Sequence, residues 1–308
     1  MTGGMIVRSR PSALGLLFTL RGSIVPRIAL RILVIAAVSA AITAAHHFRP
    51  GLLPELPATP FTLLGLGLSI FLGFRNSACY DRWWEARKQW GQLVTEARCL
   101  AREVSALLPA DGAVVQRVTR RTIGFAHALA ARLRGLDTAE AAGPWLPADE
   151  ARSLGTRANP PDSILRTMTA DFGDSLRRGD IGEVSFATLE ARVASLCAIQ
   201  AACERIKTTP TPFAYTLLLH RTAWLFCLLV PFALVSSAGA AAPLVAAILA
   251  YAFFGLDALG DELEEPFALQ PNTLPLNALV RIIEIELLEG LGETSLPPLL
   301  IPVDSLLQ

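Results

Sequence analysis

The sequence predicts an all-α membrane protein with four transmembrane helices and a cytosolic helical bundle. Of its 308 residues, 52% are hydrophobic and only 18% are charged, against about 25% charged in soluble globular proteins. The mean hydropathy is +0.45. The apolar residues gather in four stretches, and a long polar region between the second and third stretch has helical spacing. We therefore expect part of this chain to be embedded in lipid.

Two apolar stretches lie near the N-terminus. Residues 28–45 are apolar apart from Arg31, whose long side chain can reach the membrane surface from a position near the end of a span. Residues 61–74 are also apolar and end at Arg75. A span needs roughly 20 apolar residues, so we expect the second stretch to be a short span or one that does not face lipid.

The polar region that follows predicts helices in water. Residues 114–133 have the apolar spacing of an amphipathic helix. Pro144, Pro147 and the run Asn159-Pro160-Pro161 mark loops inside this region. We therefore predict a cytosolic helical region.

Two further apolar stretches follow at residues 213–235 and 243–259, joined by an uncharged link. Asp257 and Asp261 share a helix face with Glu265. We interpret them as the solvated acidic end of the last membrane helix, and attraction of cations is the alternative. His220, beside Arg221 near the start of the third stretch, is a candidate for a buried polar contact because ionisable groups in spans usually face protein or water. A tail helix is expected at residues 276–289.

Basic residues predict the orientation of the spans. Five lie before the first stretch or in its first turn, and four follow the second: Arg8, Arg10, Arg21, Arg27 and Arg31, then Arg75, Arg82, Arg87 and Lys88. The first link has only Arg49, and the second link has no Lys or Arg. Basic flanks are typically cytoplasmic, so both termini are predicted inside the cell, in a plasma (inner) membrane.

The predicted division has five parts: a cytosolic N-terminal segment (1–27), spans one and two (28–80), a cytosolic helical region (81–212), spans three and four (213–260), and a cytosolic C-terminal helix and tail (261–308). The five cysteines have no CxxC or CxxH spacing, and an odd number argues against a disulfide framework. Reduced thiols are expected.

Two stripes follow the second apolar stretch at intervals of four residues. One is large and apolar (Leu66, Ile70 and Phe74), and the other is small (Gly65, Ser69 and Gly73). In one reading, the large stripe faces lipid or the core of a single chain, and the small stripe packs on a neighbouring span. In the other, copies of this helix surround an axis, the small stripe packs between subunits, and the large stripe forms a hydrophobic constriction that gates by dewetting.

Several motifs resemble the bestrophin family. Residues 67–76 (GLSIFLGFRN) and 80–91 (YDRWWEARKQWG) match the signature of its second span. Residues 209–216 (TPTPFAYT) and 264–267 (EEPF) agree with it in order and distance. The resemblance covers nearly the whole chain, and it implies a homopentameric ion channel with a single pore along the five-fold axis.

The resemblance also implies roles for individual residues. Leu66, Ile70 and Phe74 match the three neck positions of the family. Val184 falls on a second constriction at the cytosolic end of the pore, although an ordinary core valine is the alternative there. The expected partners are further copies of the chain, membrane lipid and monovalent ions, with no nucleic acid and no cofactor.

Two departures from the family bear on regulation and selectivity. Animal members hold calcium with acids after their Pro-Phe, whereas Pro266-Phe267 is followed here by uncharged residues, so no metal site is expected. Animal members also have aromatic residues at two of the three neck positions, and the edges of these rings can favour an anion. Here Ile70 occupies one of the positions, so Phe74 is the one aromatic residue of the three. The bacterial branch, which this sequence resembles, is associated with monovalent cations. The sequence therefore favours a cation such as sodium, with chloride as the alternative.

An enzyme is not expected. The chain has no HExxH, GxSxG or P-loop motif and no GxGxxG between strand and helix. A carrier or scaffold is the remaining alternative, but a carrier would usually have repeated halves with broken helices, and no such repeat is visible.

Overall fold

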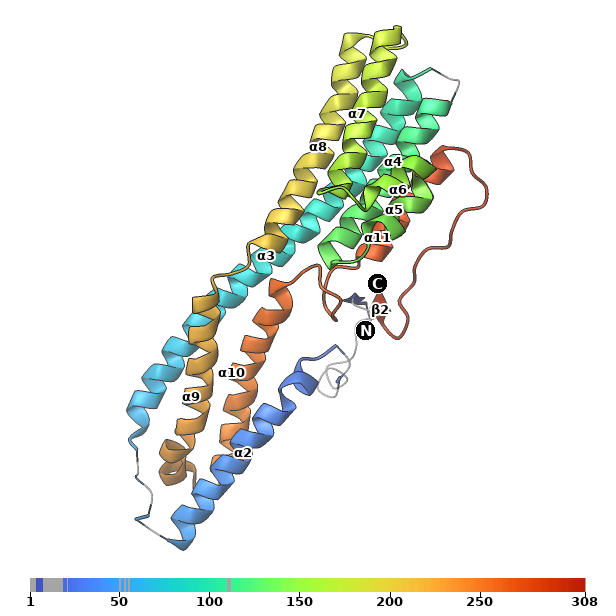
Figure 1. Cartoon of the computed structure of the whole chain (residues 1–308). Coiled ribbons are helices and arrows are strands. Elements are labelled where there is room, and N and C mark those ends of the chain that lie inside the picture. The colour runs from blue at the N-terminus through green and yellow to red at the C-terminus, as the bar shows by residue number, and fades with distance from the viewer. Residues whose placement is uncertain are drawn as a thin grey trace. The chain divides into compact units, whose positions relative to one another are not determined.

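The structure is a computed structural model, and it describes residues 4–7, 19–20, 22–49, 51–52, 54, 56–109 and 112–307. Helices account for most of this part of the chain (Figure 1). The long helices are α2 (Val25–Phe48), α3 (Ala58–Leu107), α4 (Ala113–Arg134), α7 (Pro160–Arg178), α8 (Glu183–Thr208), α9 (Phe213–Ala238), α10 (Ala242–Glu264) and α11 (Leu276–Gly290). The short ones are α5 (Thr138–Ala142), η1 (Gly143–Trp145), α6 (Ala148–Leu154) and η2 (Gly239–Ala241). Arg8, Arg10 and Arg21, which helped to predict the orientation, lie outside the described residues.

The predicted all-α class is correct, with one small addition. A two-residue antiparallel ladder pairs β1 (Met5–Ile6) with β2 (Leu306–Leu307). Strands of two residues leave no period that a sequence pattern can detect. The ladder ties an N-terminal segment to the C-terminal tail.

Helix α3 is longer than the sequence suggested. It contains the second apolar stretch and continues through the polar motif without a break for 50 residues, which corresponds to about 75 Å at 1.5 Å per residue. No proline lies between Pro60 and Pro109, so nothing in this range removes a helical hydrogen bond. The membrane segment and the polar segment are therefore parts of one helix.

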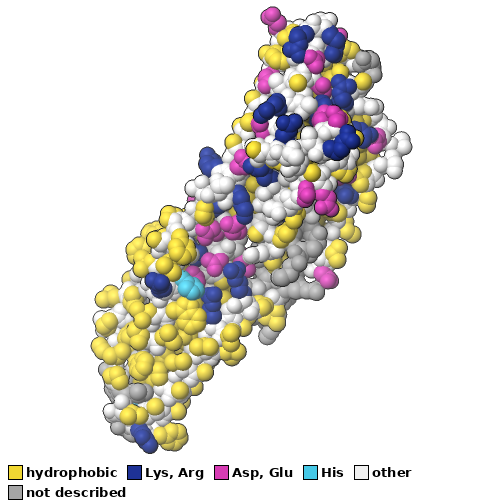
Figure 2. Space-filling view, in the orientation of Figure 1, with side chains coloured by type: hydrophobic (Ala, Val, Ile, Leu, Met, Phe, Trp, Pro, Cys, Tyr) yellow, Lys and Arg dark blue, Asp and Glu magenta, His cyan; other side chains and the backbone are white. Residues whose placement is uncertain are grey.

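The chain divides into two compact units, and α3 contributes to both. Unit 2 contains residues 8–83 and 210–265. In it, α2, α9 and α10 lie against one another (Figure 1), and Leu68 and Leu72 of α3 join their core with Phe226 and Phe254. Figure 2 shows hydrophobic side chains covering the visible surface of these helices. An apolar surface over an apolar core is typical of a protein solvated by lipid.

Unit 1 contains residues 1–7, 84–209 and 266–308. Helix α4 packs against α5, α7 and α11, and α7 packs against α8. The predicted amphipathic helix at 114–133 is α4, which is buried on all sides over residues 121–126. The Asn159-Pro160-Pro161 run does not form the predicted loop: it begins α7, with Asn159 as the N-cap and Pro160 in the first turn, where a missing N–H costs nothing.

Four helical stretches are long and apolar enough to cross a membrane: α2, α3, α8 and the range 213–264 that holds α9 and α10. Helix α8 was not predicted as a span, and its mean hydropathy of 1.2 is the lowest of the four. Its charged side chains form ion pairs within unit 1, including Arg192 with Glu103 and Arg205 with Glu85. Such pairing is typical of a helix in water, so we assign α8 to the polar bundle. The four predicted spans correspond to α2, the first part of α3, α9 and α10.

Candidate pore neck

The large apolar stripe of α3 is exposed in the single chain. Leu66, Ile70 and Phe74 have 59%, 47% and 64% of their surface accessible. Each is one helical turn from the next, so all three lie on one face. A row of large exposed apolar side chains needs either lipid or another protein surface beside it. The core of the single chain, one of the surroundings considered for this stripe, is therefore excluded.

The opposite face of the same segment is packed. Leu68 and Leu72 are buried in the core of unit 2. The residues of the small stripe differ in their surroundings: one packs inside the chain and two are exposed. A Cβ atom on Gly65 would lie 3.2 Å from the ring of Phe226 in α9, whereas Ser69 is exposed and no atom lies within 4 Å of a Cβ on Gly73. Gly65 therefore permits close packing inside the chain, and the other two small residues lie on open surface.

Val184 is the second residue of α8, and 82% of its surface is exposed. It is not the core valine that was the alternative for this position. The structure places it at the N-terminal end of a helix in unit 1, where its side chain is free for contact with solvent or another molecule.

A buried ion-pair network begins at the residue after the neck stripe. The side chain of Arg75 is 0% exposed, and that of Asp257 in α10 is 1% exposed. Arg75 Nη1 donates to Asp257 Oδ1 at 3.0 Å, and Nη2 donates to Asp261 Oδ1 at 2.6 Å. Glu264 Oε2 lies 3.5 Å from Nη2. The C-terminal end of the neck segment is therefore fastened to α10 by one arginine.

Side chains from two other helices also contact the Asp257 carboxylate. His220 Nδ1 in α9 lies 2.7 Å from Asp257 Oδ2, and Arg31 Nη1 in α2 lies 3.7 Å from the same oxygen. One carboxylate therefore joins all four membrane helices of unit 2. The interpretation of Asp257 as part of a solvated acidic end was wrong, because its helix turns it into the core. The polar contact predicted for His220 is present.

Arg75 was read from the sequence only as the end of a span and a sign of orientation. The available signal was the pairing of an arginine at the end of one apolar stretch with an aspartate inside another, since ionisable groups in spans tend to pair with one another. Which acid it meets depends on how the helices pack. Gly260 shows how closely α10 approaches: a Cβ there would lie 2.7 Å from Asn76 Oδ1 and 3.1 Å from Arg75 Nη1.

Three of the motifs that are distant in sequence meet at the end of unit 2. Arg82 Nε donates to the Glu264 carbonyl oxygen at 2.7 Å. The Glu264 carboxylate accepts from the Thr211 backbone N–H at 3.0 Å and from its hydroxyl. The segments 80–91, 209–216 and 264–267 thus form one structural junction.

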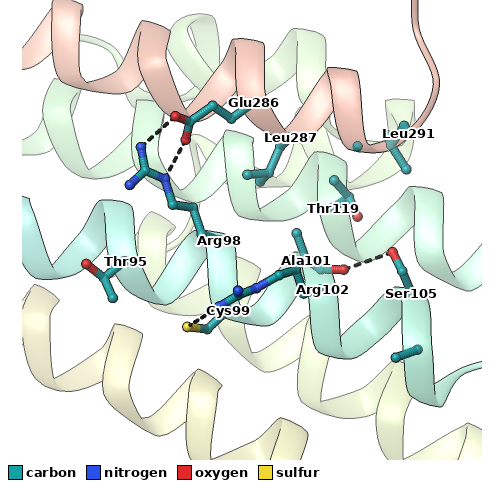
Figure 3. Close-up of a pocket in the computed structure, with 12 residues that line it drawn as sticks. Thr95, Arg98, Cys99, Ala101, Arg102, Ser105, Thr119, Glu286, Leu287 and Leu291 are labelled. Carbon is teal, nitrogen blue, oxygen red and sulfur yellow. Dashed lines mark hydrogen bonds and ion pairs between the residues drawn. The ribbon is translucent and has the colours of Figure 1, made fainter.

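A separate cavity of about 650 Å³ lies in unit 1 between α3, α4 and α11, lined by residues that include Thr95, Arg102 and Leu287 (Figure 3). Arg98 and Glu286 point toward each other across its edge and form two hydrogen bonds, of 2.6 and 2.5 Å. This pairing raises the pKa of Arg98. The cavity has no arrangement of nucleophile and base. Among the described residues, no group of three or more His, Cys, Asp or Glu side chains is placed to hold a metal ion.

Comparison with known proteins gives the family. The sequence pattern described as "Bacterial/Fungal Bestrophin protein" matches residues 5–289. The chain belongs to the bestrophin family. Its relatives include the voltage-dependent anion channel-forming protein of Mesorhizobium japonicum, 47% identical over 97% of this chain and 96% of that protein. Another is the voltage-dependent anion channel-forming protein YneE of Escherichia coli K12, 39% identical over 97% of this chain and 98% of that protein.

Solved structures agree with this assignment. The crystal structure of a bacterial bestrophin homolog from Klebsiella pneumoniae matches with a TM-score of 0.84 at 35% identity, covering 87% of this chain and 100% of that one. The predicted bestrophin resemblance and fold class are therefore confirmed. Bestrophins are membrane-embedded ion channels, so this chain is a channel protein and not an enzyme. The names of the relatives favour the anion alternative over the predicted cation.

Proposed function

We propose that this chain is one subunit of a pentameric channel that passes monovalent ions passively through a single axial pore. The observation that carries the proposal is the exposed stripe of Leu66, Ile70 and Phe74 on a helix whose other face is packed. Five copies of the stripe around an axis form a narrow apolar neck. Water leaves such a constriction readily, so the cost of dehydrating the ion controls opening.

The small residues beside the stripe support a close ring. Ser69 and Gly73 lie on open surface of α3, and small side chains let membrane helices approach closely. In the assembled channel they contact the neighbouring subunit. Gly65, which faces Phe226, serves packing within the subunit.

Val184 forms a second constriction at the cytosolic end of the pore. Its exposure on the first turn of α8 supports this role, because a buried valine could not face an ion path. A wider vestibule in the helical bundle separates it from the neck. Both chain termini lie on the cytoplasmic side of the inner membrane, as the basic flanks of the spans indicate.

The neck is tested by replacing Leu66, Ile70 and Phe74 together with alanine. The variant channel should have a higher open probability in planar bilayers, because a wider neck dewets less readily. A matched control replaces three exposed leucines on other helices of unit 2, Leu30, Leu218 and Leu244. If the currents of the triple-alanine variant match those of the wild type, or if the control variant changes equally, the stripe does not form the gate.

The conducted ion is either an anion, our first candidate, or a cation, our second. Anion conduction is the first, because two relatives that match over nearly the whole chain are named as anion channel-forming proteins. Cation conduction is the second, because only Phe74 among the three neck positions carries an aromatic ring whose edge could favour an anion.

Purified protein in a planar bilayer under asymmetric sodium chloride separates the two candidates. Reversal near the chloride potential supports the first, and reversal near the sodium potential supports the second. Ile70→Phe restores a second ring to the neck, and Ile70→Leu is its matched apolar control. If the ring edge contributes to selection, only Ile70→Phe moves the reversal potential toward chloride. Silence of both wild type and neck variant would overturn the channel proposal for this chain.

A further inference from the structure

One cavity in unit 1 contains a half-buried positive charge that the described part of the chain leaves without a counterion. It has a volume of about 370 Å³ and lies between α4 and α11, with Leu300 of the tail at its rim. We call it the Arg134 cavity. Its volume is within the range of small-ligand sites, about 300–1,000 Å³.

Arg134 lies at the C-terminal end of α4 and lines this cavity. Its Nη1 donates to Asn277 Oδ1 at 2.6 Å, and its Nη2 donates to the Leu274 carbonyl oxygen at 3.4 Å. Its Nε is buried without a hydrogen-bond partner. A guanidinium has five N–H donors in a planar fork, and Nη1 and Nη2 each have one N–H left for another molecule. No carboxylate within salt-bridge distance of Arg134 occurs among the residues that the structure describes.

The other charged groups of the cavity are already paired with one another. Arg281 Nε donates to Glu284 Oε2 at 3.1 Å, and His127 Nε2 lies 3.5 Å from the same oxygen. His127 also stacks on Trp145 at a centroid distance of 5.5 Å. Burial lowers the pKa of His127, which therefore favours the neutral form. With Arg281 and Glu284 cancelling, Arg134 gives the cavity one net positive charge.

The guanidinium of Arg134 is half-buried, so it has lost part of its hydration. Such a loss is unfavourable unless a partner of opposite charge replaces the water. Burial alone lowers the pKa of Arg134. Elsewhere in unit 1 the buried Arg121 is held by the carboxylates of Glu150 and Asp171. The contrast indicates that the partner of Arg134 comes from outside the described chain.

We propose that the Arg134 cavity binds a small organic monocarboxylate. One unpaired positive charge matches one negative charge, and the fork of free N–H groups matches the two oxygens of a carboxylate. The remaining wall consists mainly of alanine, valine and leucine side chains, which suits a short apolar body. The Asn277 side chain provides a further polar contact. The site is separate from the neck, and its occupation does not depend on which ion the channel conducts.

The test is a thermal shift of the full-length protein in detergent, titrated with sodium hexanoate and sodium benzoate at constant ionic strength and chloride. An anion that binds the folded state raises the melting temperature with concentration. The wild type should respond to at least one of the two carboxylates. Arg134→Gln should weaken the apparent affinity about tenfold or more, since the variant loses the charge-assisted hydrogen bonds to the carboxylate.

Arg166→Gln is the matched control, because Arg166 is an exposed arginine of unit 1 that pairs with Asp162 on its own helix. It removes the same charge and should leave the response unchanged. Inorganic phosphate is titrated separately: a response to phosphate alone would overturn the assignment to carboxylates. Equal responses in Arg134→Gln and wild type, or no response in wild type, would overturn the site.

A second variant covers the case in which Arg134→Gln does not fold. Leu300→Trp enlarges a rim side chain on the tail without changing any charge. It should occupy part of the cavity and weaken carboxylate binding. An unchanged affinity in this variant would also overturn the proposal. Because binding is read from melting and not from current, failure here leaves the proposed channel function untouched.

Discussion

Arg75 in unit 2 and Arg121 in unit 1 are both buried arginines that bind carboxylates from other helices, but their surroundings differ. Arg75 joins α3 to α10 directly after the neck stripe, inside a unit whose surface is apolar. Arg121 joins α4 to Glu150 of α6 and Asp171 of α7 in the polar bundle. The same chemistry therefore serves two purposes. In unit 1 it fixes a bundle, whereas in unit 2 it also fixes the helix that carries the candidate gate.

The largest effect is expected from Arg75→Met. Removing the cation leaves Asp257 and Asp261 without their main partner, and breaking a buried ion pair costs about 3–5 kcal/mol. The melting temperature should fall, and any channels that assemble should gate differently because the end of the neck segment is no longer fastened. Melting curves and bilayer currents of the same preparation measure both. If the variant is destabilised but gates normally, the Arg75 ion pairs stabilise the fold without influencing the neck.

Arg121→Met should cost about 3 kcal/mol or more for the same reason, because Glu150 and Asp171 lose a shared partner. Open probability and conductance should not change, since the residue lies in the packed bundle. Arg166→Met is the matched control: its exposed pair with Asp162 should contribute only about 0.3–0.5 kcal/mol. A change of gating in Arg121→Met would contradict the comparison, because the Arg121 ion pairs would then influence the gate as the Arg75 ion pairs do.

The smallest effect concerns pH and is confined to unit 1. Burial lowers the pKa of His127 below its ordinary value of 6.5. The unfolded chain therefore binds a proton more readily than the folded chain, and the stability that this residue confers is fully present above pH 6.5 and declines as the pH falls below it. The slope from one such group is at most about 1.4 kcal/mol per pH unit.

Melting curves at pH 7.5 and 5.5 test this expectation. His127→Gln should lose less stability than the wild type between these values, because glutamine does not titrate. His46→Gln is the matched control, since His46 lies in the last turn of α2, in unit 2. An identical pH dependence in His127→Gln and wild type would mean that protonation of other groups determines acid stability.

The sequence by itself determined the fold class, the four apolar stretches and the family. Hydrophobic runs and helical spacing are local properties, so α2, α4, α9, α10 and α11 lie within a few residues of their predicted ranges. The motifs identified the bestrophin family because they retain order and distance along nearly the whole chain. The neck stripe followed from a four-residue period in one helix, and its role as a gate remains a prediction.

Tertiary structure decided which groups meet. Asp257 and Asp261 have similar local sequence surroundings, yet Asp257 is buried against Arg75, His220 and Arg31 while Asp261 is half-buried. Gly65, Ser69 and Gly73 share a stripe, yet only Gly65 packs inside the chain. Arg134 and Arg121 lie on the same helix, yet only Arg121 meets carboxylates. Burial and charge pairing depend on residues more than a hundred positions apart in several of these contacts, and no local pattern records how distant helices pack.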